Sequence, residues 1–172
     1  MRNWREQGRA QDAMGYYLKA VAIFDALSDR QGIASVLANI ALLYQLNSYP
    51  QAALKQYHEA LKLFIEVEDQ INVAKTLGNI ALIHLGDAQA EQAQEYAEQA
   101  LAYYRDLGDK HGEVTMLVTL AQAHTDLGQF IDARTFAHEA QQLATMWDFT
   151  DQLERLRLLK QGGMPTGSHY VE

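Results

Sequence analysis

Residues 53–64 read ALKQYHEALKLF, and residues 93–104 read AQEYAEQALAYY. Each stretch holds two alanines with the same spacing, Ala53 and Ala60 in the first and Ala93 and Ala100 in the second. The same pair of positions holds alanine at 13 and 20 and again at 133 and 140. Small side chains at fixed places let two helices approach closely, and a period of about 40 residues is typical of stacked repeat units that share one continuous core. The period therefore predicts a repeat architecture.

The composition is that of a soluble globular chain. Of its 172 residues 48% are apolar and 21% are charged, which provides enough apolar surface for a core. The formal charge of −8 disfavours a phosphate-binding surface, so no nucleic-acid partner is expected. The chain lacks cysteine, which excludes disulfides and thiolate sites, and no apolar run is long enough for a membrane span or a signal peptide. We expect a cytoplasmic protein without membrane insertion.

Alignment on the alanines divides the chain into repeat units at 32–71, 72–111 and 112–151, preceded by a partial unit at 1–31. The first half of each unit carries the same apolar positions, which are Leu37, Ile40, Ala41 and Tyr44, then Leu77, Ile80, Ala81 and His84, then Leu117, Leu120, Ala121 and His124. Offsets of three, four and seven form one stripe on a helix, and the alanine series forms a stripe on a second helix. The fold class predicted is all-α, a solenoid of antiparallel helix pairs.

Turn residues separate the predicted helices. Pro50 suits the first turn of a helix because its missing N–H would have no partner there. Gly86-Asp87 and Leu127-Gly128 are expected to break the next two pairs. An aspartate precedes the first helix of each unit, where its carboxylate can accept hydrogen bonds from free backbone amides; these are Asp29, Asp69 and Asp109.

The small-aromatic-small pattern of the second helix, in register with the Leu, Ile/Leu and Ala stripe of the first, resembles the tetratricopeptide repeat family. The resemblance covers residues 1 to about 151 and is closest to the longer variant of about 40 residues found in kinesin light chains and in bacterial, especially cyanobacterial, arrays. It implies a right-handed superhelix whose first helices line a concave groove. It also implies a non-enzymatic scaffold or assembly factor that binds a peptide or protein segment in that groove.

The resemblance places one set of residues in the groove: Ser35, Ala38, Asn39, Leu42, Lys75, Asn79, Leu82, Thr115, Val118, Thr119 and Gln122. Asn39 and Asn79 share one position, and a side-chain amide suits a peptide backbone because it donates and accepts at once. Thr119 replaces the third asparagine. Only Lys75 is basic, so an apolar or mixed segment is expected rather than a C-terminal carboxylate. The alternative that the asparagines are polar residues without a ligand stays open.

No metal, cofactor or catalytic site is predicted. The chain has no His-Glu-x-x-His spacing, no calcium loop, no phosphate loop and no Gly-x-Ser-x-Gly motif. His84 and His124 take the place of Tyr44 in the repeat, so we expect them to be packing residues that also reach a backbone acceptor. Glu91, Glu95 and Glu98 share one solvated helix face. Tyrosines outside the repeat register, such as Tyr16, are candidates for a partner surface.

The two ends depart from the repeat. Trp4 falls in register with Tyr44, so residues 1–7 match only the end of a first helix. Residues 152–161 are expected to form a capping helix, with Lys160 and Gln161 where earlier units have Ile-Ala, and residues 162–172 a flexible tail. Two alternatives to a free-standing adaptor stay open. One is a sensor or regulatory segment of a larger signalling protein, and the other is a self-associating module that forms a homo-oligomer through its incomplete first repeat.

Overall fold

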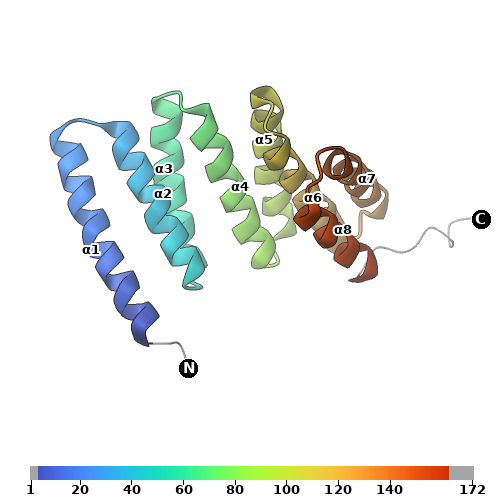
Figure 1. The fold of residues 1–172 in the computed structure, drawn as a ribbon, viewed down its shortest axis with the longest axis horizontal. Helices are drawn as coiled ribbons and strands as arrows, with labels where there is room; N and C mark the ends of the chain where they lie inside the picture. The colour runs from blue at the N-terminus through green and yellow to red at the C-terminus, as the bar shows by residue number, and fades with distance from the viewer. Residues whose placement is uncertain (1–3, 163–172) are drawn as a thin grey trace, which may run out of the picture. The chain divides into compact units, whose positions relative to one another are not determined.

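The computed structural model describes residues 4–162, with side chains described from Met14 to Gln161. Every regular element in this range is an α-helix (Figure 1), as predicted. The helices are α1 (Trp4–Ala26), α2 (Arg30–Leu46), α3 (Pro50–Glu66), α4 (Gln70–Gly86), α5 (Ala90–Leu107), α6 (Lys110–Asp126), α7 (Phe130–Met146) and α8 (Thr150–Gly162). Of the predicted tail only Gly162 lies within the described residues, and it ends α8 instead of starting a tail.

The chain divides into two compact units, residues 1–76 and residues 77–172, and α4 begins in the first unit and ends in the second. In the first unit α2 packs against both α1 and α3. In the second unit α6 packs against α5, α7 and α8, and α7 also packs against α8. Within each unit, helices that follow one another in the sequence are therefore neighbours in space, as in a solenoid.

The alanine series lies in the buried core of the helix pairs. Six of these alanines are completely buried: Ala53, Ala60, Ala93, Ala100, Ala133 and Ala140. Large side chains fill the space between them, and Tyr57 and Phe64 of α3 are each 1% exposed. In α7 the core face consists of alanines alone, with Ala137 and Ala144 completing the series. The small side chains let the helix backbones approach, and the aromatic rings bury the apolar area that stabilises each pair.

The connections between helices recur at half the period of the sequence repeat. At each connection one residue has a positive φ between 54° and 73°: Ser28, Ser48, Glu68, Ala88, Gly108, Gly128 and Asp148. Around Ser48, for example, the Tyr49 N–H donates to the Tyr44 carbonyl over 2.9 Å, and the Ser48 N–H donates to the Gln45 carbonyl over 3.0 Å. This is the Schellman pattern, in which a left-handed residue satisfies the last helix carbonyls.

The predicted helix starts are confirmed at their caps. The Asp29 carboxylate accepts from the Gly32 N–H over 2.8 Å, and the Asp109 carboxylate accepts from the Gly112 N–H over 2.9 Å. The Asp69 carboxylate accepts from the Asn72 N–H over 3.1 Å, at the equivalent position of the next repeat. Pro50 is the first residue of α3, as its missing N–H suggested. These contacts satisfy amides that have no partner within the helix.

Both predicted breaks are confirmed. α4 ends at Gly86, and α6 ends at Asp126 just before Leu127-Gly128, where Gly128 has φ 73°. At the first break the left-handed residue is Ala88 and not a glycine, because that residue has the same place at every connection whichever side chain is there.

Both ends of the chain also differ from prediction. Residues 4–8 continue into α1 and do not end a separate first helix, because a lone Gly8 costs a helix only about 1 kcal/mol and no turn sequence surrounds it. The capping helix α8 begins at Thr150, two residues before the predicted start, in phase with helix starts at 30, 70 and 110.

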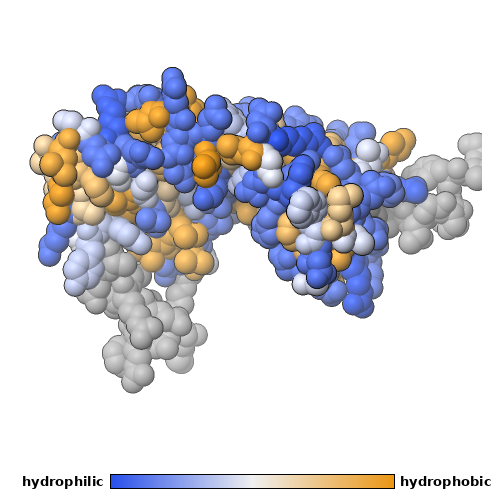
Figure 2. Space-filling view, turned by 45° about the horizontal axis from the view of Figure 1, so that its top comes forward, coloured by the Kyte–Doolittle hydropathy of each residue, from blue (hydrophilic) through white to orange (hydrophobic). Residues whose placement is uncertain are grey.

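The exposed faces of the helices differ in polarity (Figure 2). In α5 the exposed side chains include Glu91, Glu95, Glu98, Arg105 and Asp106, and α3 exposes Lys55, Glu59, Lys62 and Glu66. The described part of α1 exposes only Lys19 and Asp25 as charged side chains, and hydrophobic residues, coloured orange, gather at the left end of Figure 2. Among these helices, α1 is therefore the one with a mainly apolar outer face.

Candidate functional site

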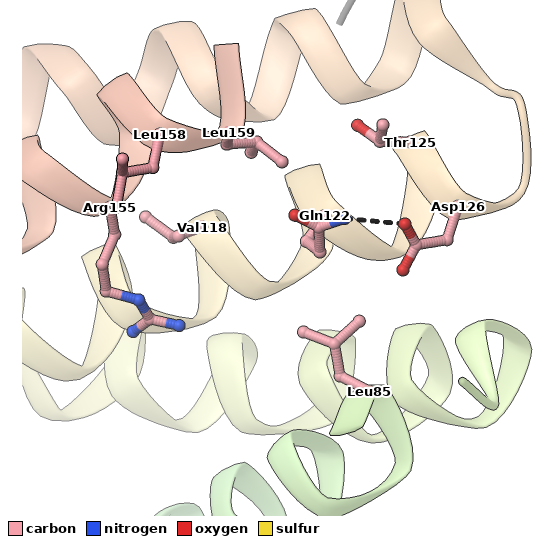
Figure 3. A pocket seen from close by; sticks show the side chains of 8 residues that line it. All are labelled: Leu85, Val118, Gln122, Thr125, Asp126, Arg155, Leu158 and Leu159. Atoms are coloured by element: carbon pink, nitrogen blue, oxygen red, sulfur yellow. Dashed lines mark hydrogen bonds between the residues drawn. The ribbon is translucent and has the colours of Figure 1, made fainter. Parts of the chain in front are cut away.

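A cavity of about 400 Å³ opens in the second unit, between the end of α4, the middle of α6, and α8 (Figure 3). Its lining residues are Leu85 from α4, Val118, Gln122, Thr125 and Asp126 from α6, and Arg155, Leu158 and Leu159 from α8. Figure 3 shows Leu85 pointing from α4 towards Gln122 and the α8 leucines lying across from α6. Three helices that are distant in sequence thus meet around one hollow.

The cavity combines an apolar wall with a few polar groups. Leu85, Leu158 and Leu159 supply aliphatic surface, and Leu158 is 57% exposed. The Gln122 side-chain amide donates to an Asp126 carboxylate oxygen over 2.6 Å, which fixes both groups at one end. At the other end Arg155 donates a long hydrogen bond of 3.4 Å to the Gln152 side-chain oxygen and has no other polar partner among the described side chains. Its guanidinium therefore keeps donors for a ligand with a carboxylate or carbonyl group.

Two of the predicted groove residues, Val118 and Gln122, line this cavity. Asn79 and Leu82 are half-buried on α4. Thr115 is half-buried and its hydroxyl donates to the His111 carbonyl over 2.8 Å.

Thr119 is not accessible to a ligand, although the resemblance places it in the groove. It is completely buried, and its hydroxyl donates to the Thr115 carbonyl over 2.9 Å. A threonine is short enough to fold back on its own helix, whereas a longer amide in this place would extend away from it. Thr119 thus offers no free polar group to a ligand.

The remaining predicted groove residues belong to the first unit. Asn39 is exposed on α2, and Leu42 is 43% exposed one turn further along. The Ser35 hydroxyl donates to the Gln31 carbonyl over 2.9 Å, and Ala38 is half-buried. Lys75 is exposed on the part of α4 that belongs to this unit. The accessible members of this set are Asn39, Leu42 and Lys75.

The sequence reasoning missed the contribution of α8, although a signal was present. Arg155 lies one repeat period after Thr115, and Leu158 lies one period after Val118. The helix that was expected only to cap the array therefore continues the register of a first helix. Its inner positions, Gln152, Leu156 and Leu159, are buried, with exposed fractions of 3%, 2% and 8%. Extending the period by one helix would have added Arg155 and Leu158 to the predicted groove.

The two repeat histidines are packing residues, as expected, but their hydrogen-bond partner is not a backbone group. Nδ1 of His84 lies 2.6 Å from the Gln89 side-chain oxygen, and Nδ1 of His124 lies 2.5 Å from that of Gln129. A ring stacks on each imidazole, Tyr96 on His84 and Phe136 on His124. In both repeats the glutamine follows the histidine by five residues. Its side-chain oxygen therefore takes the place expected for a backbone carbonyl.

A buried carboxylate stands apart from the cavity, at the start of α6. Glu113 is 5% exposed and accepts from Lys110 Nζ over 2.8 Å and from Arg105 Nε over 3.1 Å. Arg105 also donates to Glu139 over 2.5 Å. Burial raises the pKa of the Glu113 carboxyl, but the two basic partners outweigh it and hold that pKa below its usual value. The network joins α5, α6 and α7 and is structural.

Among residues 4–162, no three His, Asp or Glu side chains gather in a way that could hold a metal ion. In the same range no helix combines the length and the apolar character needed to cross a bilayer.

Known proteins of similar sequence or structure support one family. Residues 33–106 match the tetratricopeptide repeat family. No curated protein matches the chain. Among solved structures, BtubC (BKLC) from P. vanneervenii has a TM-score of 0.74 at 21% identity over 82% of this chain and 59% of its own.

Two further solved structures show the same fold. Aspartyl phosphate phosphatase F from Bacillus subtilis has a TM-score of 0.74 at 14% identity over 88% of this chain and 41% of its own. The nearly identical TPR-like repeats of a putative kinesin light chain from Podosopora anserina have a TM-score of 0.64 at 16% identity, covering 92% of this chain and 90% of theirs. The chain thus spans less than two thirds of the first two proteins. Residues 33–106 belong to the tetratricopeptide repeat family, and the helices on both sides of them continue its fold.

Proposed function

We propose that the chain is a non-enzymatic protein-binding module whose second unit holds a peptide segment over the cavity between α4, α6 and α8. The observation that carries the proposal is that Val118 and Gln122, which the family resemblance assigns to a groove, meet Leu158 and Arg155 of α8 around one hollow. A volume of about 400 Å³ is sufficient for one or two apolar side chains.

The lining indicates the chemistry of the segment. The aliphatic wall formed by Leu85, Leu158 and Leu159 favours an apolar side chain. Arg155 has few competing partners and favours an acidic group or a main-chain carbonyl beside that side chain. Asn79 could bind the peptide backbone, as its amide both donates and accepts. A groove held open by packed helices loses little conformational entropy on binding, which favours affinity.

Peptides selected from a random phage-displayed library against the full chain provide the test, with dissociation constants measured by fluorescence anisotropy. Leu158→Glu and Arg155→Glu are expected to weaken the selected peptides at least tenfold. Asn79→Ala is expected to cost about 1 kcal/mol, or roughly fivefold. Arg157→Glu is the matched control, because Arg157 lies on the same helix but not in the cavity and pairs with Glu154.

The outcome that rejects the site is specific. If Arg155→Glu and Arg157→Glu change affinity equally, or if Leu158→Glu has no effect, the peptide binds elsewhere on the chain. If in addition Asn39→Ala and not Asn79→Ala weakens binding, the first unit carries the site.

A second candidate function is a sensor or regulatory segment of a larger protein. It is favoured by the fact that the chain spans only 41% of aspartyl phosphate phosphatase F and 59% of BtubC, at TM-scores of 0.74. Reading the gene beyond both ends of the 172 residues distinguishes it from a free-standing adaptor.

The lack of cysteine supports our further proposal of a reducing compartment, the cytoplasm.

A further inference from the structure

We infer that the cavity between α4, α6 and α8 selects a bipolar peptide segment, one that carries an acidic and a basic residue on either side of an apolar one. The inference rests on the proposed function and adds the charge pattern of the partner. Two side chains of opposite charge line the cavity, Arg155 and Asp126, and the other lining residues are uncharged. The lining is therefore neutral as a whole, in a chain whose formal charge is −8.

Neither of these two charges is paired within the part of the chain that the structure describes. Arg155 forms no ion pair there, and Asp126 accepts only from the neutral amide of Gln122, over 2.6 Å. The control comes from the same helix: Arg157, which does not line the cavity, pairs with Glu154 over 3.4 Å. A guanidinium and a carboxylate in one cavity thus both keep hydrogen-bonding capacity for the opposite charges of a ligand.

The two charges lie at opposite ends of the cavity and do not neutralise each other. In Figure 3 the Arg155 guanidinium lies at the left, near Val118. The Asp126 carboxylate lies at the right, and Leu85 lies between the two charges in this view. Val118 and Asp126 are eight residues apart on α6, which is a rise of about 12 Å. An extended peptide rises about 3.3 Å per residue, so its two complementary charges are expected about three to five residues apart.

The apolar wall between the charges makes them act together. Leu158 is 57% exposed and Leu85 is half-buried, so both offer surface to an apolar side chain of the segment. That side chain would displace water from the cavity, and an ion pair in a less polar environment is less screened than one on an open surface. The leucines alone would accept many segments, whereas two opposite charges fix the register and the direction of one.

The same arrangement disfavours segments with charge of one sign. A uniformly basic segment is attracted by the acidic chain in general but meets Arg155 at one end of the cavity. A uniformly acidic segment meets Asp126 at the other end. A bipolar segment laid in the reverse direction brings like charges together at both ends, which is how charge patterns exclude wrong partners.

Peptides from a random phage-displayed library, selected on the full chain and then depleted on Leu158→Glu, provide the probe. The peptides retained by this procedure bind the cavity. They are expected to carry an acidic and a basic residue about three to five positions apart, with an apolar residue between them.

Double-mutant cycles with the tightest of these peptides test each charge, by fluorescence anisotropy. Asp126→Asn is expected to weaken the parent peptide about two- to fivefold and to leave a peptide whose basic residue is replaced by glutamine unaffected. Arg155→Gln is expected to act in the same way on the acidic residue. Asp132→Asn is the matched control, because Asp132 is exposed on α7 outside the cavity and should change neither affinity.

A charge exchange tests the direction. Arg155→Glu combined with Asp126→Lys swaps the two ends of the cavity, and both positions are exposed, so the helices are expected to keep their packing. The same library selected on this double variant is expected to yield peptides with the opposite order of charges along the chain. Circular dichroism spectra that match the wild type exclude a loss of folding as the cause.

The outcomes separate this inference from the proposed function. If no selected peptide depends on Leu158, the cavity is not the binding site and both are rejected. If cavity-dependent peptides are found but lack one of the two charges, show no coupling to Asp126 or Arg155, or keep the same charge order on the exchanged variant, the bipolar selection alone is overturned.

Discussion

The alanine that turns the chain after α4 provides a sharp test of the backbone. Ala88 has φ 57°, a left-handed conformation that costs a residue with a Cβ about 1–2 kcal/mol. Gly86 lies two residues earlier, inside the last turn of α4, where a Cβ would meet nothing within 4 Å. The glycine of this connection thus stands where the helix disfavours it, and an alanine stands where a glycine fits.

The expected energies follow from these two positions. Ala88→Gly removes the left-handed strain but adds about 0.5–1 kcal/mol of unfolded-chain entropy, for a net gain of about 0.5–1 kcal/mol. Gly86→Ala gains up to about 1 kcal/mol in helix propensity, less at the end of a helix. The double variant exchanges the two residues and is expected to gain about 1–2 kcal/mol, or roughly 2–8 °C in Tm for a chain of this size.

Urea titration and thermal unfolding followed by circular dichroism measure these changes, and hydrogen exchange at the end of α4 localises them. Local measurement matters because repeat units contact mainly their neighbours and need not unfold together. Gly128→Ala is the opposite control: with φ 73° at the matching turn, it should lose about 1 kcal/mol. The reasoning is refuted if Ala88→Gly destabilises the chain while Gly86→Ala does so as well.

Two further predictions concern Gly112 and Glu113 at the start of α6. Gly112→Ala should destabilise it by about 1–3 kcal/mol, since a Cβ there would lie 2.3 Å from the Tyr104 ring, whereas Gly15→Ala meets open space and should be tolerated; urea midpoints compare the two. Glu113→Gln should lose about 1–3 kcal/mol at pH 7, because it removes charged hydrogen bonds with Lys110 and Arg105. The pKa of Glu113 is lowered in the folded chain, so its carboxylate stabilises above the usual value of 4.5 and loses that effect as the pH falls through the folded pKa. The difference between wild type and Glu113→Gln should therefore shrink in acid, and a difference that is constant from pH 7 to pH 3 would contradict the assigned role.

Several features could be predicted because their causes are local or periodic. The buried alanine pairs, the aspartate caps and Pro50 at the start of α3 depend on spacing and on hydrogen bonds within a few residues. Val118 and Gln122, which the family resemblance placed in a groove, line a cavity together with residues of α8 that the prediction did not include. Gly86-Asp87 marked the end of α4 correctly, but the left-handed residue of that turn is Ala88, because its place is fixed by the spacing of the turns and not by the residue that suits it best.

The sequence by itself determined that the chain is a stack of helix pairs with one regular period, since that pattern is written in the spacing of its alanines and leucines. Only the tertiary structure decided which of those side chains are accessible. In the folded chain Thr119 is buried, and Arg155 and Leu158 of the capping helix lie beside α6. Tyr16 and Ile23 of α1 are exposed. The physical reason is that register tells which positions are equivalent, whereas exposure depends on which neighbouring helix is present and on the length of each side chain. The same repeat position can therefore be core in one unit, line a cavity in another and be exposed in a third.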